Sequence, residues 1–259
     1  VSNEKVPQYS RPMISEYVSK EATLDTMKYR SDEFWTSHNV KALTGKTATK
    51  IDFENKQVEL DGKEKISYDK LLLATGGRPF VPRMDGGDKE GVFTFTELSN
   101  AEGIEQKVVT SESAVVIGGG LIGVSASESL VKRGINVTLV ELKDNILNLI
   151  LNKTASEIAE KVLTEAGVTV VTGKYVQKIL GQEGNENAVG GVIMTDGTQV
   201  PCDLVVVAIG VIPRTELVKN TAVKVNRGIL IDRLMKTSVP AIYASGAVAE
   251  CYDFLINGI

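Results

Sequence analysis

Short, mostly apolar runs alternate along this chain with a segment in which apolar residues recur every four positions. Residues 114–117 (AVVI) and 135–141 (INVTLVE) have the length and composition of buried parallel strands. Between them, residues 121–133 carry apolar side chains at helical spacing. This order of strand, helix and strand predicts a parallel βαβ unit.

Two passages of the chain repeat one hydrophobic pattern. Residues 61–79 (DGKEKISYDKLLLATGGRP) and 196–213 (DGTQVPCDLVVVAIGVIP) each run from an Asp-Gly turn through a polar strand and an apolar strand to a small-residue loop ending in Pro. LTGKTATKI (43–51) also recurs, as VTGKYVQKI (171–179). We therefore predict two copies of a Rossmann-like unit followed by a strand meander and a return strand. The offset places the first copy's glycine loop before Val1, so we expect its first βαβ unit to be missing.

The loop between the first strand and the helix has the glycine spacing G-x-G-x-x-G, at Gly118, Gly120 and Gly123. The first glycine permits a tight turn, the second lets the backbone approach a pyrophosphate, and the third lets helix and strand pack closely. The amide groups at the start of the helix, from Leu121 and Ile122, would attract the phosphates. In this context the spacing predicts a dinucleotide site, and the alternative is a glycine-rich turn without a ligand.

Glu141 ends the second strand, where an acidic side chain accepts hydrogen bonds from the adenosine ribose hydroxyls. Its charge would repel a 2′-phosphate, and no Arg follows it. We therefore predict that the cofactor is NADH rather than NADPH.

Composition narrows the classes of function. The net charge is −4 and no block of Lys and Arg is present, which argues against a nucleic-acid partner. The longest apolar stretch, Leu204–Ile212, is far shorter than the ~20 residues that span a bilayer, so no membrane partner is expected. Cys202 and Cys251 have no CxxC partner, which fits a reducing cytoplasm. With His38 the single histidine, we expect no histidine-based metal site.

Two local patterns lie outside these motifs. Thr154 and Glu157 have the spacing of a capping box, which predicts that a crossover helix begins there. The acidic segment 181–190 (GQEGNENAVG) is typical of a solvated hairpin loop.

Five segments, in this order and spacing, carry a family resemblance: YSRPMISEY (9–17), YDKLLLATGGRP, VVIGGGLIG, VVVAIGVIP and IYASGAVAE (242–250). With them the chain resembles the FAD/NAD(P)-dependent pyridine nucleotide-disulfide oxidoreductase superfamily. It is most similar to the branch that contains rubredoxin and ferredoxin reductases, NADH oxidases and the NADH-oxidising part of nitrite reductases.

The resemblance implies an α/β fold of two Rossmann-like dinucleotide-binding domains with parallel sheets and β-meanders, the second inserted in the first. The FAD-binding domain would comprise residues 1–103 and 224–259, and the NAD-binding domain residues 104–223. Gly210 would lie near the nicotinamide. The residues placed beside FAD are Arg11, Pro12, Ala48, Thr75, Gly76, Gly246 and Ala247.

The resemblance further implies an oxidoreductase that passes hydride from NADH to FAD. Electrons would then go to an acceptor such as a rubredoxin or ferredoxin, dioxygen or a fused reductase module. No catalytic side chain is expected, because the cofactors carry the reaction. A C-terminal domain that forms the dimer interface in this family is not part of the chain, so a homodimer is expected only for a full-length protein.

Three residues depart from the family pattern. Ala247 replaces an Asp that bonds the ribityl chain of FAD, Ser125 replaces a Glu near the nicotinamide, and Glu16 replaces a Lys that faces the flavin. Two alternatives therefore stay open: an NAD(H)-binding module without flavin activity, and a disulfide reductase. The segment 9–17 has no Cys, so the second would have to use Cys251.

Overall fold

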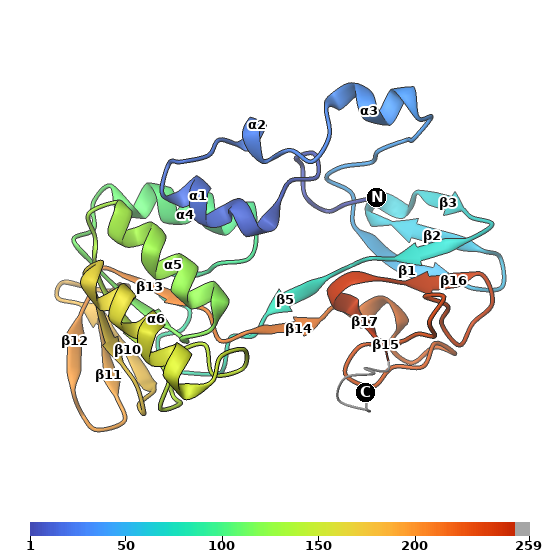
Figure 1. The fold of residues 1–259 in the computed structure, drawn as a ribbon. Coiled ribbons are helices and arrows are strands. Elements are labelled where there is room, and N and C mark those ends of the chain that lie inside the picture. Colours follow the sequence, from blue (N-terminus) through green and yellow to red (C-terminus); the bar gives the residue numbers. More distant parts are fainter. Residues whose placement is uncertain (252–259) are drawn as a thin grey trace. The chain divides into compact units, whose positions relative to one another are not determined.

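The computed structural model describes residues 1–251, which form two compact units (Figure 1). Unit 1 contains Val1–Gln8, Lys28–Arg78 and the chain from Val211 on, and unit 2 contains Tyr9–Met27 and Pro79–Gly210. The predicted limits of the cofactor domains, 1–103 with 224–259 and 104–223, stay a prediction. Their residues 252–259 lie outside the described part of the chain.

A five-stranded parallel sheet forms the centre of unit 2, in the order β6-β13-β7-β8-β9. Its strands are β6 (Val92–Thr94), β7 (Ser113–Ile117), β8 (Asn136–Val140), β9 (Val168–Val171) and β13 (Leu204–Val207). The chain winds from β7 to β9 in one direction and then returns to place β13 on the other side of β7. The strand order therefore reverses between β7 and β13, and ligands of such sheets bind beside that point, at the carboxyl ends of the strands.

Three longer helices and an antiparallel meander accompany this sheet. They are α4 (Leu98–Val108), α5 (Leu121–Lys132), α6 (Lys153–Glu165), β10 (Val176–Gln182), β11 (Asn185–Met194) and β12 (Gln199–Pro201). Val115 and Val205 point to the meander side, where they pack in one core with Ile179 and Val192. Since side chains alternate along a strand, their neighbours point to the other face, against which α5 packs (Figure 1).

The boundaries of α5 and β8 agree with the predicted βαβ unit, but two local predictions are wrong. Helix α6 begins at Lys153, and its N-cap is Asn152, whose Oδ1 accepts from the amide of Ala155 at 3.0 Å. The segment 181–190 is mostly strand, because β10 and β11 pair up to Gln182 and Asn185 and leave a turn of two residues. Its polar residues, 182–187, are exposed at the turn and at the strand ends beside it.

A short helical segment from the N-terminal part of the chain also belongs to unit 2. It consists of η1 (Arg11–Met13), α1 (Ile14–Val18) and α2 (Leu24–Met27). Ile14 and Val18 bury their side chains where α1 packs against α4 and α5. Arg133, just after α5, fixes the end of α1 by donating from Nη1 to the carbonyl of Val18 at 2.7 Å, and it forms an ion pair with Glu105 of α4.

Unit 1 is built from shorter elements. They are α3 (Asp32–Ser37), η2 (Asp61–Lys63), η3 (Glu216–Val218), η4 (Gly246–Val248), and the strands β1 (Ala48–Asp52), β2 (Gln57–Leu60), β3 (Lys65–Ser67), β4 (Leu71–Leu73), β5 (Gly77–Pro79), β14 (Val211–Pro213), β15 (Ile229–Leu230), β16 (Ile242–Ala244) and β17 (Ala249–Glu250). β1, β2 and β3 form an antiparallel meander, and β4 pairs with β16 in parallel. Ile51, Leu73, Ile229 and Ile242 belong to its core.

The same series of elements occurs twice along the chain. β1, β2 and β3 are followed by β4 and β5, just as β10, β11 and β12 are followed by β13 and β14. This order agrees with the predicted repeat, and the α/β class with parallel sheets and β-meanders is confirmed. No helix within residues 1–251 has the length and apolar character needed to cross a membrane.

Candidate dinucleotide-binding site

Each glycine of the loop between β7 and α5 has its own geometric reason. Gly118 has φ 109°, and a Cβ there would lie 2.5 Å from the carbonyl oxygen of Ala208. A Cβ on Gly123 would collide with the carbonyl oxygen of Gly118, so this glycine sets how closely α5 approaches the strand. A Cβ on Gly120 would meet no atom within 4 Å. The protein therefore does not itself require a glycine at position 120, but the approach of a ligand to the backbone would.

The N-terminus of α5 is open. Gly120 is its N-cap and has no side chain to offer, and no other described side chain caps this end. The amide of Val124 bonds back to Gly120 O at 2.9 Å, as the first in the helix to do so. The amides of Leu121, Ile122 and Gly123 lie in the first turn of α5, where no carbonyl four residues earlier accepts from them, and they are therefore available to an anion. The loop and the helix end fit the diphosphate of a dinucleotide.

Glu141 stands directly after β8, at the same edge of the sheet, and is half-buried. Its Oε2 accepts from the amide of Gly119 at 2.6 Å, and its Oε1 accepts from the amide of Lys143 at 2.8 Å. The carboxylate is thus fixed against the glycine loop by two backbone donors. Its contact with the ribose remains a prediction.

Gly210 lies beyond the end of β13, on the other side of the switch point. It has φ 113° and open space where a Cβ would be. The amide of Ala208 donates to Ile117 O at 2.8 Å, which joins this loop to the end of β7. Gly118, Gly120, Leu121, Ile122, Gly123, Glu141 and Gly210, the predicted NAD residues, are therefore all at the carboxyl edge of one sheet.

Arg11 and Pro12, predicted to lie beside FAD, are exposed residues of η1 in unit 2. The Nη1 group of Arg11 donates to Thr96 O at 2.6 Å, and its guanidinium lies 5.5 Å from the ring centroid of Tyr9. The hydroxyl of Tyr9 in turn accepts from the amide of Leu98, the first residue of α4, at 2.9 Å. This segment is thus fastened to the chain that follows β6.

Four of the other predicted FAD residues gather in unit 1, after the adjacent parallel strands β4 and β16. Thr75 and Gly76 follow β4, and Gly246 and Ala247 follow β16. Both glycines have positive φ, 67° and 73°, and a Cβ at either position would meet no atom within 4 Å, so both loops leave the backbone accessible. The Oγ1 of Thr75 donates to Arg214 O at 2.8 Å. Ala48 lies elsewhere in the unit, in the meander at the start of β1.

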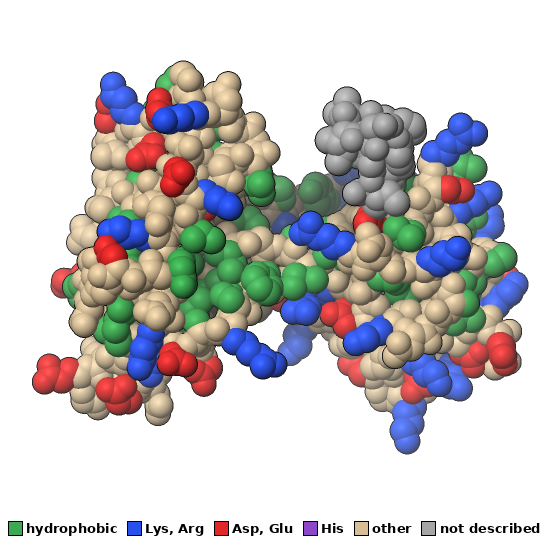
Figure 2. Space-filling view, turned by 90° about the horizontal axis from the view of Figure 1, so that it is seen from below, with side chains coloured by type: hydrophobic (Ala, Val, Ile, Leu, Met, Phe, Trp, Pro, Cys, Tyr) green, Lys and Arg blue, Asp and Glu red, His purple; other side chains and the backbone are tan. Residues whose placement is uncertain are grey.

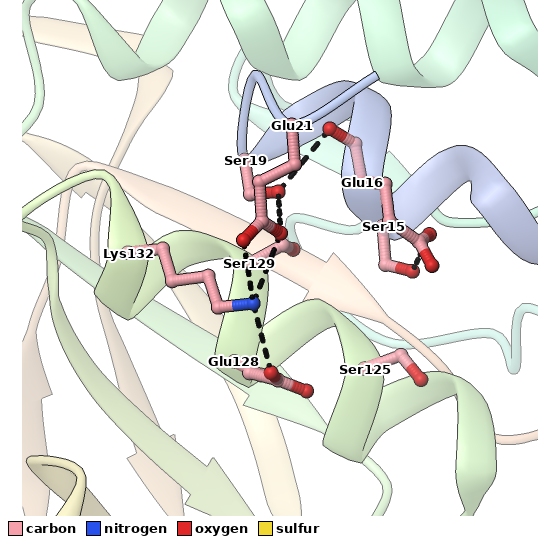
Figure 3. A pocket seen from close by; sticks show the side chains of 8 residues that line it. All are labelled: Ser15, Glu16, Ser19, Glu21, Ser125, Glu128, Ser129 and Lys132. Carbon is pink, nitrogen blue, oxygen red and sulfur yellow. Dashed lines mark hydrogen bonds and ion pairs between the residues drawn. The ribbon is translucent and has the colours of Figure 1, made fainter. Parts of the chain in front are cut away.

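A pocket between α1 and α5 brings together two residues that sequence reasoning noted only as departures from a family pattern (Figure 3). Glu16 comes from α1, and Ser125 comes from the second turn of α5. The pocket is lined by Ser15, Glu16, Ser19, Glu21, Ser125, Glu128, Ser129 and Lys132. Its lining comes from segments more than a hundred positions apart in the chain, so no local pattern could have indicated it.

Neither cysteine forms a disulfide. Burial, together with the nearby charge of Asp203, raises the pKa of Cys202 to about 12, so this thiol is unreactive at neutral pH. Cys251 is exposed. Within residues 1–251, no group of three His, Cys, Asp or Glu side chains is placed to hold a metal ion.

Comparison with known proteins identifies the family. The family model described as pyridine nucleotide-disulphide oxidoreductase matches residues 1–258. The chain belongs to this family. It is 34% identical over 248 residues to the assimilatory nitrate reductase electron transfer subunit of Bacillus subtilis (strain 168), covering 96% of this chain and 32% of that protein. It is 32% identical over 255 residues to putidaredoxin reductase CamA of Pseudomonas putida, covering 97% of this chain and 60% of that one.

A solved structure shows the same fold. The chain superposes with a TM-score of 0.92 on the reductase in the crystal structure of the covalent putidaredoxin reductase–putidaredoxin complex, at 31% identity, covering 98% of this chain and 62% of that one. The fold is therefore that of reductases with Rossmann-like domains, as predicted. The family member described here spans between about a third and two thirds of these relatives' lengths.

Proposed function

We propose that this chain is the dinucleotide-binding part of an NADH-dependent flavoprotein reductase, in which hydride passes from NADH to FAD and electrons go on to a second acceptor. The observation that carries the proposal is the uncapped N-terminus of α5 with open space at Gly120. A helix end of this kind favours a diphosphate, and its place beside the switch point of a parallel sheet suits a dinucleotide.

In the NAD half, the chain's own residues bind and orient. The amides of Leu121 and Ile122 would hold the diphosphate, while Glu141 would accept the ribose hydroxyls and disfavour a 2′-phosphate. Gly210, across the switch point, would leave room for the nicotinamide. Such residues raise the rate by placing two reacting groups in contact and excluding water, which needs no acid or base from the protein.

In the FAD half, the loops after β4 and β16 present accessible backbone at Gly76 and Gly246. When bound there, FAD would accept two electrons as hydride and release them one at a time to an acceptor. Thr75 would line the same loops. Ala247 provides no carboxylate, so the ribityl chain would be held by backbone groups alone.

The acceptor is proposed from the names of the relatives. These include a putidaredoxin reductase, a rubredoxin–NAD(+) reductase and an NADH oxidase, so an iron–sulfur or rubredoxin carrier or dioxygen is the expected class. We place the protein in the cytoplasm, because both of its thiols are free. A homodimer is proposed for the full-length protein.

Binding of NADH by a Gly120→Ala variant tests the proposal. Gly120 has φ −78° and free space for a Cβ, so the variant should fold like the wild type, yet its methyl group would stand where the diphosphate approaches. We expect an unchanged free energy of unfolding and a Kd for NADH raised about tenfold or more, measured by NADH fluorescence. An unchanged Kd would refute the proposed site.

Cofactor preference has a separate test in Glu141→Gln, which removes the charge while keeping an oxygen for the amide of Gly119. We expect the ratio of NADPH to NADH affinity to rise. Gly120→Ala serves as the matched control, since it should weaken both cofactors alike. A ratio that stays the same in Glu141→Gln would contradict the predicted preference for NADH.

One observation favours a second function. Because Ala247 offers no acceptor for FAD, the chain could serve as an NAD(H)-binding module without flavin activity. The visible absorbance of the purified protein distinguishes the two functions. A flavin spectrum that corresponds to about one FAD per chain supports the reductase, and a colourless protein that binds NADH supports the module. A disulfide reductase would need Cys251, and blocking this thiol without loss of NADH-dependent activity would exclude that alternative.

A further inference from the structure

The two units of the chain carry opposite net charge. Unit 1 has 17 Lys and Arg residues against 13 Asp and Glu residues, whereas unit 2 has 12 against 20, so their net charges are +4 and −8. The excess of cations in unit 1 is concentrated in residues 214–236, where six Lys and Arg residues occur with two acidic residues. A charge asymmetry of this kind favours a negatively charged partner at the basic segment.

Two neighbouring segments of unit 1 contain most of these cations: residues 219–227 before β15, and residues 232–238 after it. The hydroxyl of Ser238 joins the two segments. It accepts from the amide of Lys224 at 2.9 Å and donates to the carbonyl of Ala222 at 2.9 Å. The two segments therefore lie side by side, although ten or more positions separate these residues in the chain.

Five exposed cations of these segments form no ion pair within residues 1–251. The one acidic residue among them, Asp232, is engaged by the backbone, because its Oδ1 accepts from the amides of Leu234 and Lys236 at 2.8 and 2.9 Å. The positive charge of the two segments therefore stays available to a partner. The five cations are Lys219, Lys224, Arg227, Arg233 and Lys236.

Three exposed apolar side chains lie next to these cations in the sequence. Val225, Leu234 and Met235 are 38%, 60% and 48% exposed. Exposed apolar side chains with charged neighbours are typical of surfaces that bind other proteins. No residue of 219–227 or 232–238 is aromatic, so these segments lack the stacking side chains that bind the bases of a single-stranded nucleic acid.

We propose that residues 219–227 and 232–238 form a docking surface for an acidic protein. The five cations attract carboxylates of the partner and speed the encounter, while the apolar side chains contact apolar groups of the partner and slow dissociation. A long polyanion would be repelled by the charge of −8 on unit 2, so a partner with carboxylates among apolar side chains fits better. The docking surface belongs to unit 1, and its use does not depend on NADH.

Fluorescence anisotropy of two labelled peptides with the full chain tests the proposal. One peptide consists of Glu and Leu, and the other, of equal length and charge, consists of Glu and Ser. We expect the Glu/Leu peptide to bind about tenfold more tightly, and both affinities to fall as the salt concentration rises. Equal affinity for the two peptides would overturn the proposal, and so would tighter binding of single-stranded DNA or of phosphatidylserine vesicles.

Charge reversal at two neighbouring positions, Lys224→Glu together with Lys236→Glu, should raise the Kd of both peptides about tenfold or more. Lys50→Glu with Lys65→Glu is the matched control, because it changes the net charge equally at exposed positions of β1 and β3 in the same unit. We expect this control to raise the Kd less than about twofold. An equal loss in the control would show that the overall charge attracts the peptides, and would overturn the docking surface.

Leu234→Ser tests the apolar contact. We expect it to reduce the preference for the Glu/Leu peptide to less than about threefold and to leave the Kd of the Glu/Ser peptide unchanged. Leu72→Ser is the control, since Leu72 of β4 is 57% exposed and lies outside the two segments. All the substituted side chains are exposed, and circular dichroism verifies that each variant folds. An unchanged preference in Leu234→Ser, or an equal loss in Leu72→Ser, would contradict the proposed contact.

Discussion

β4 and β13 hold corresponding places in the two repeated segments, but their surroundings differ. β13 has the parallel neighbours β6 and β7, and all four of its residues are buried. In the described part of the chain, β4 pairs with β16 alone. As a result Leu72 is 57% exposed, whereas Val206, at the corresponding position, is fully buried.

The aspartate before each strand shows the same contrast. Asp203 Oδ2 accepts from the amides of Glu112 and Ser113 at 2.9 and 3.0 Å and from the hydroxyl of Ser113 at 3.0 Å. These bonds tie the start of β13 to the start of β7. Asp69, at the corresponding place before β4, is exposed. A repeated sequence thus produces the same strand twice, while burial and polar contacts depend on what lies beside it.

The largest effect is expected at the closest approach in unit 2, in Gly123→Ala. The added methyl group would collide with the backbone carbonyl of Gly118, which neither a rotamer change nor a side-chain shift relieves. We expect the free energy of unfolding of unit 2 to fall by about 4 kcal/mol or more, with loss of NADH binding. Gly76→Ala, in the loop after β4, should lower the free energy of unfolding of unit 1 by about 1–2 kcal/mol, because the alanine would be strained by the positive φ but would collide with no atom.

Chemical denaturation in urea measures both variants, with one intrinsic probe in each unit. Trp35, the single tryptophan, lies in unit 1, and the buried thiol of Cys202 in unit 2 becomes reactive only when that unit opens. Gly123→Ala should accelerate the labelling of Cys202. It should leave unchanged the urea concentration at which Trp35 fluorescence reports the unfolding of unit 1. If Gly76→Ala lowered the free energy of unfolding more than Gly123→Ala, the contrast between the two loops would be wrong.

Leucine truncation in each strand compares the two environments with identical chemistry. Leu204 in β13 is completely buried, so Leu204→Ala should lower the free energy of unfolding of unit 2 by about 3 kcal/mol. Leu72→Ala removes a side chain that is mostly in contact with solvent, and it should lower the free energy of unfolding of unit 1 by less than about 0.5 kcal/mol. Equal losses from the same urea measurements would show that β4 is covered by something other than the described residues.

What the sequence predicted correctly is local. The strand β7, the glycine loop and α5 follow from a pattern within about twenty consecutive residues, and the glycines are required by backbone geometry that any such loop shares. Two errors were also local: Asn152 caps α6 in competition with Thr154, and the polar segment 181–190 belongs to strands because an exposed hairpin tolerates polar side chains.

Features that depend on tertiary packing escaped prediction. The pocket that joins Glu16 to Ser125 arises because α1 packs against α5, and hydrophobic contacts of Ile14 and Val18 decide that packing. The bonds of Asp203 to β7 require a parallel neighbour that the sequence around Asp203 does not contain. Figure 2 shows hydrophobic side chains among those of Lys, Arg, Asp and Glu on one face of the molecule.

The smallest expected effect concerns Asp203 and depends on pH. Burial opposes its ionisation, but the amides of Glu112 and Ser113 and the hydroxyl of Ser113 outweigh this and hold the pKa of Asp203 below its usual value. The folded-state pKa lies below the unfolded value of about 3.9, so the stabilisation is fully present above that pH and is lost as the pH falls through the folded-state pKa. At pH 7, Asp203→Asn should therefore lower the free energy of unfolding by about 1–2 kcal/mol.

Urea unfolding followed by circular dichroism at pH 7 and pH 3 checks this prediction. The difference between the wild type and Asp203→Asn should narrow at pH 3, because protonation then weakens the same bonds in the wild type. Asp69→Asn, the matched change before β4, should leave the free energy of unfolding equal to that of the wild type at each pH, since the exposed carboxylate of Asp69 forms no hydrogen bond or ion pair within residues 1–251. A gap for Asp203→Asn that stays constant with pH would mean that the three bonds to β7 do not depend on the charge of Asp203.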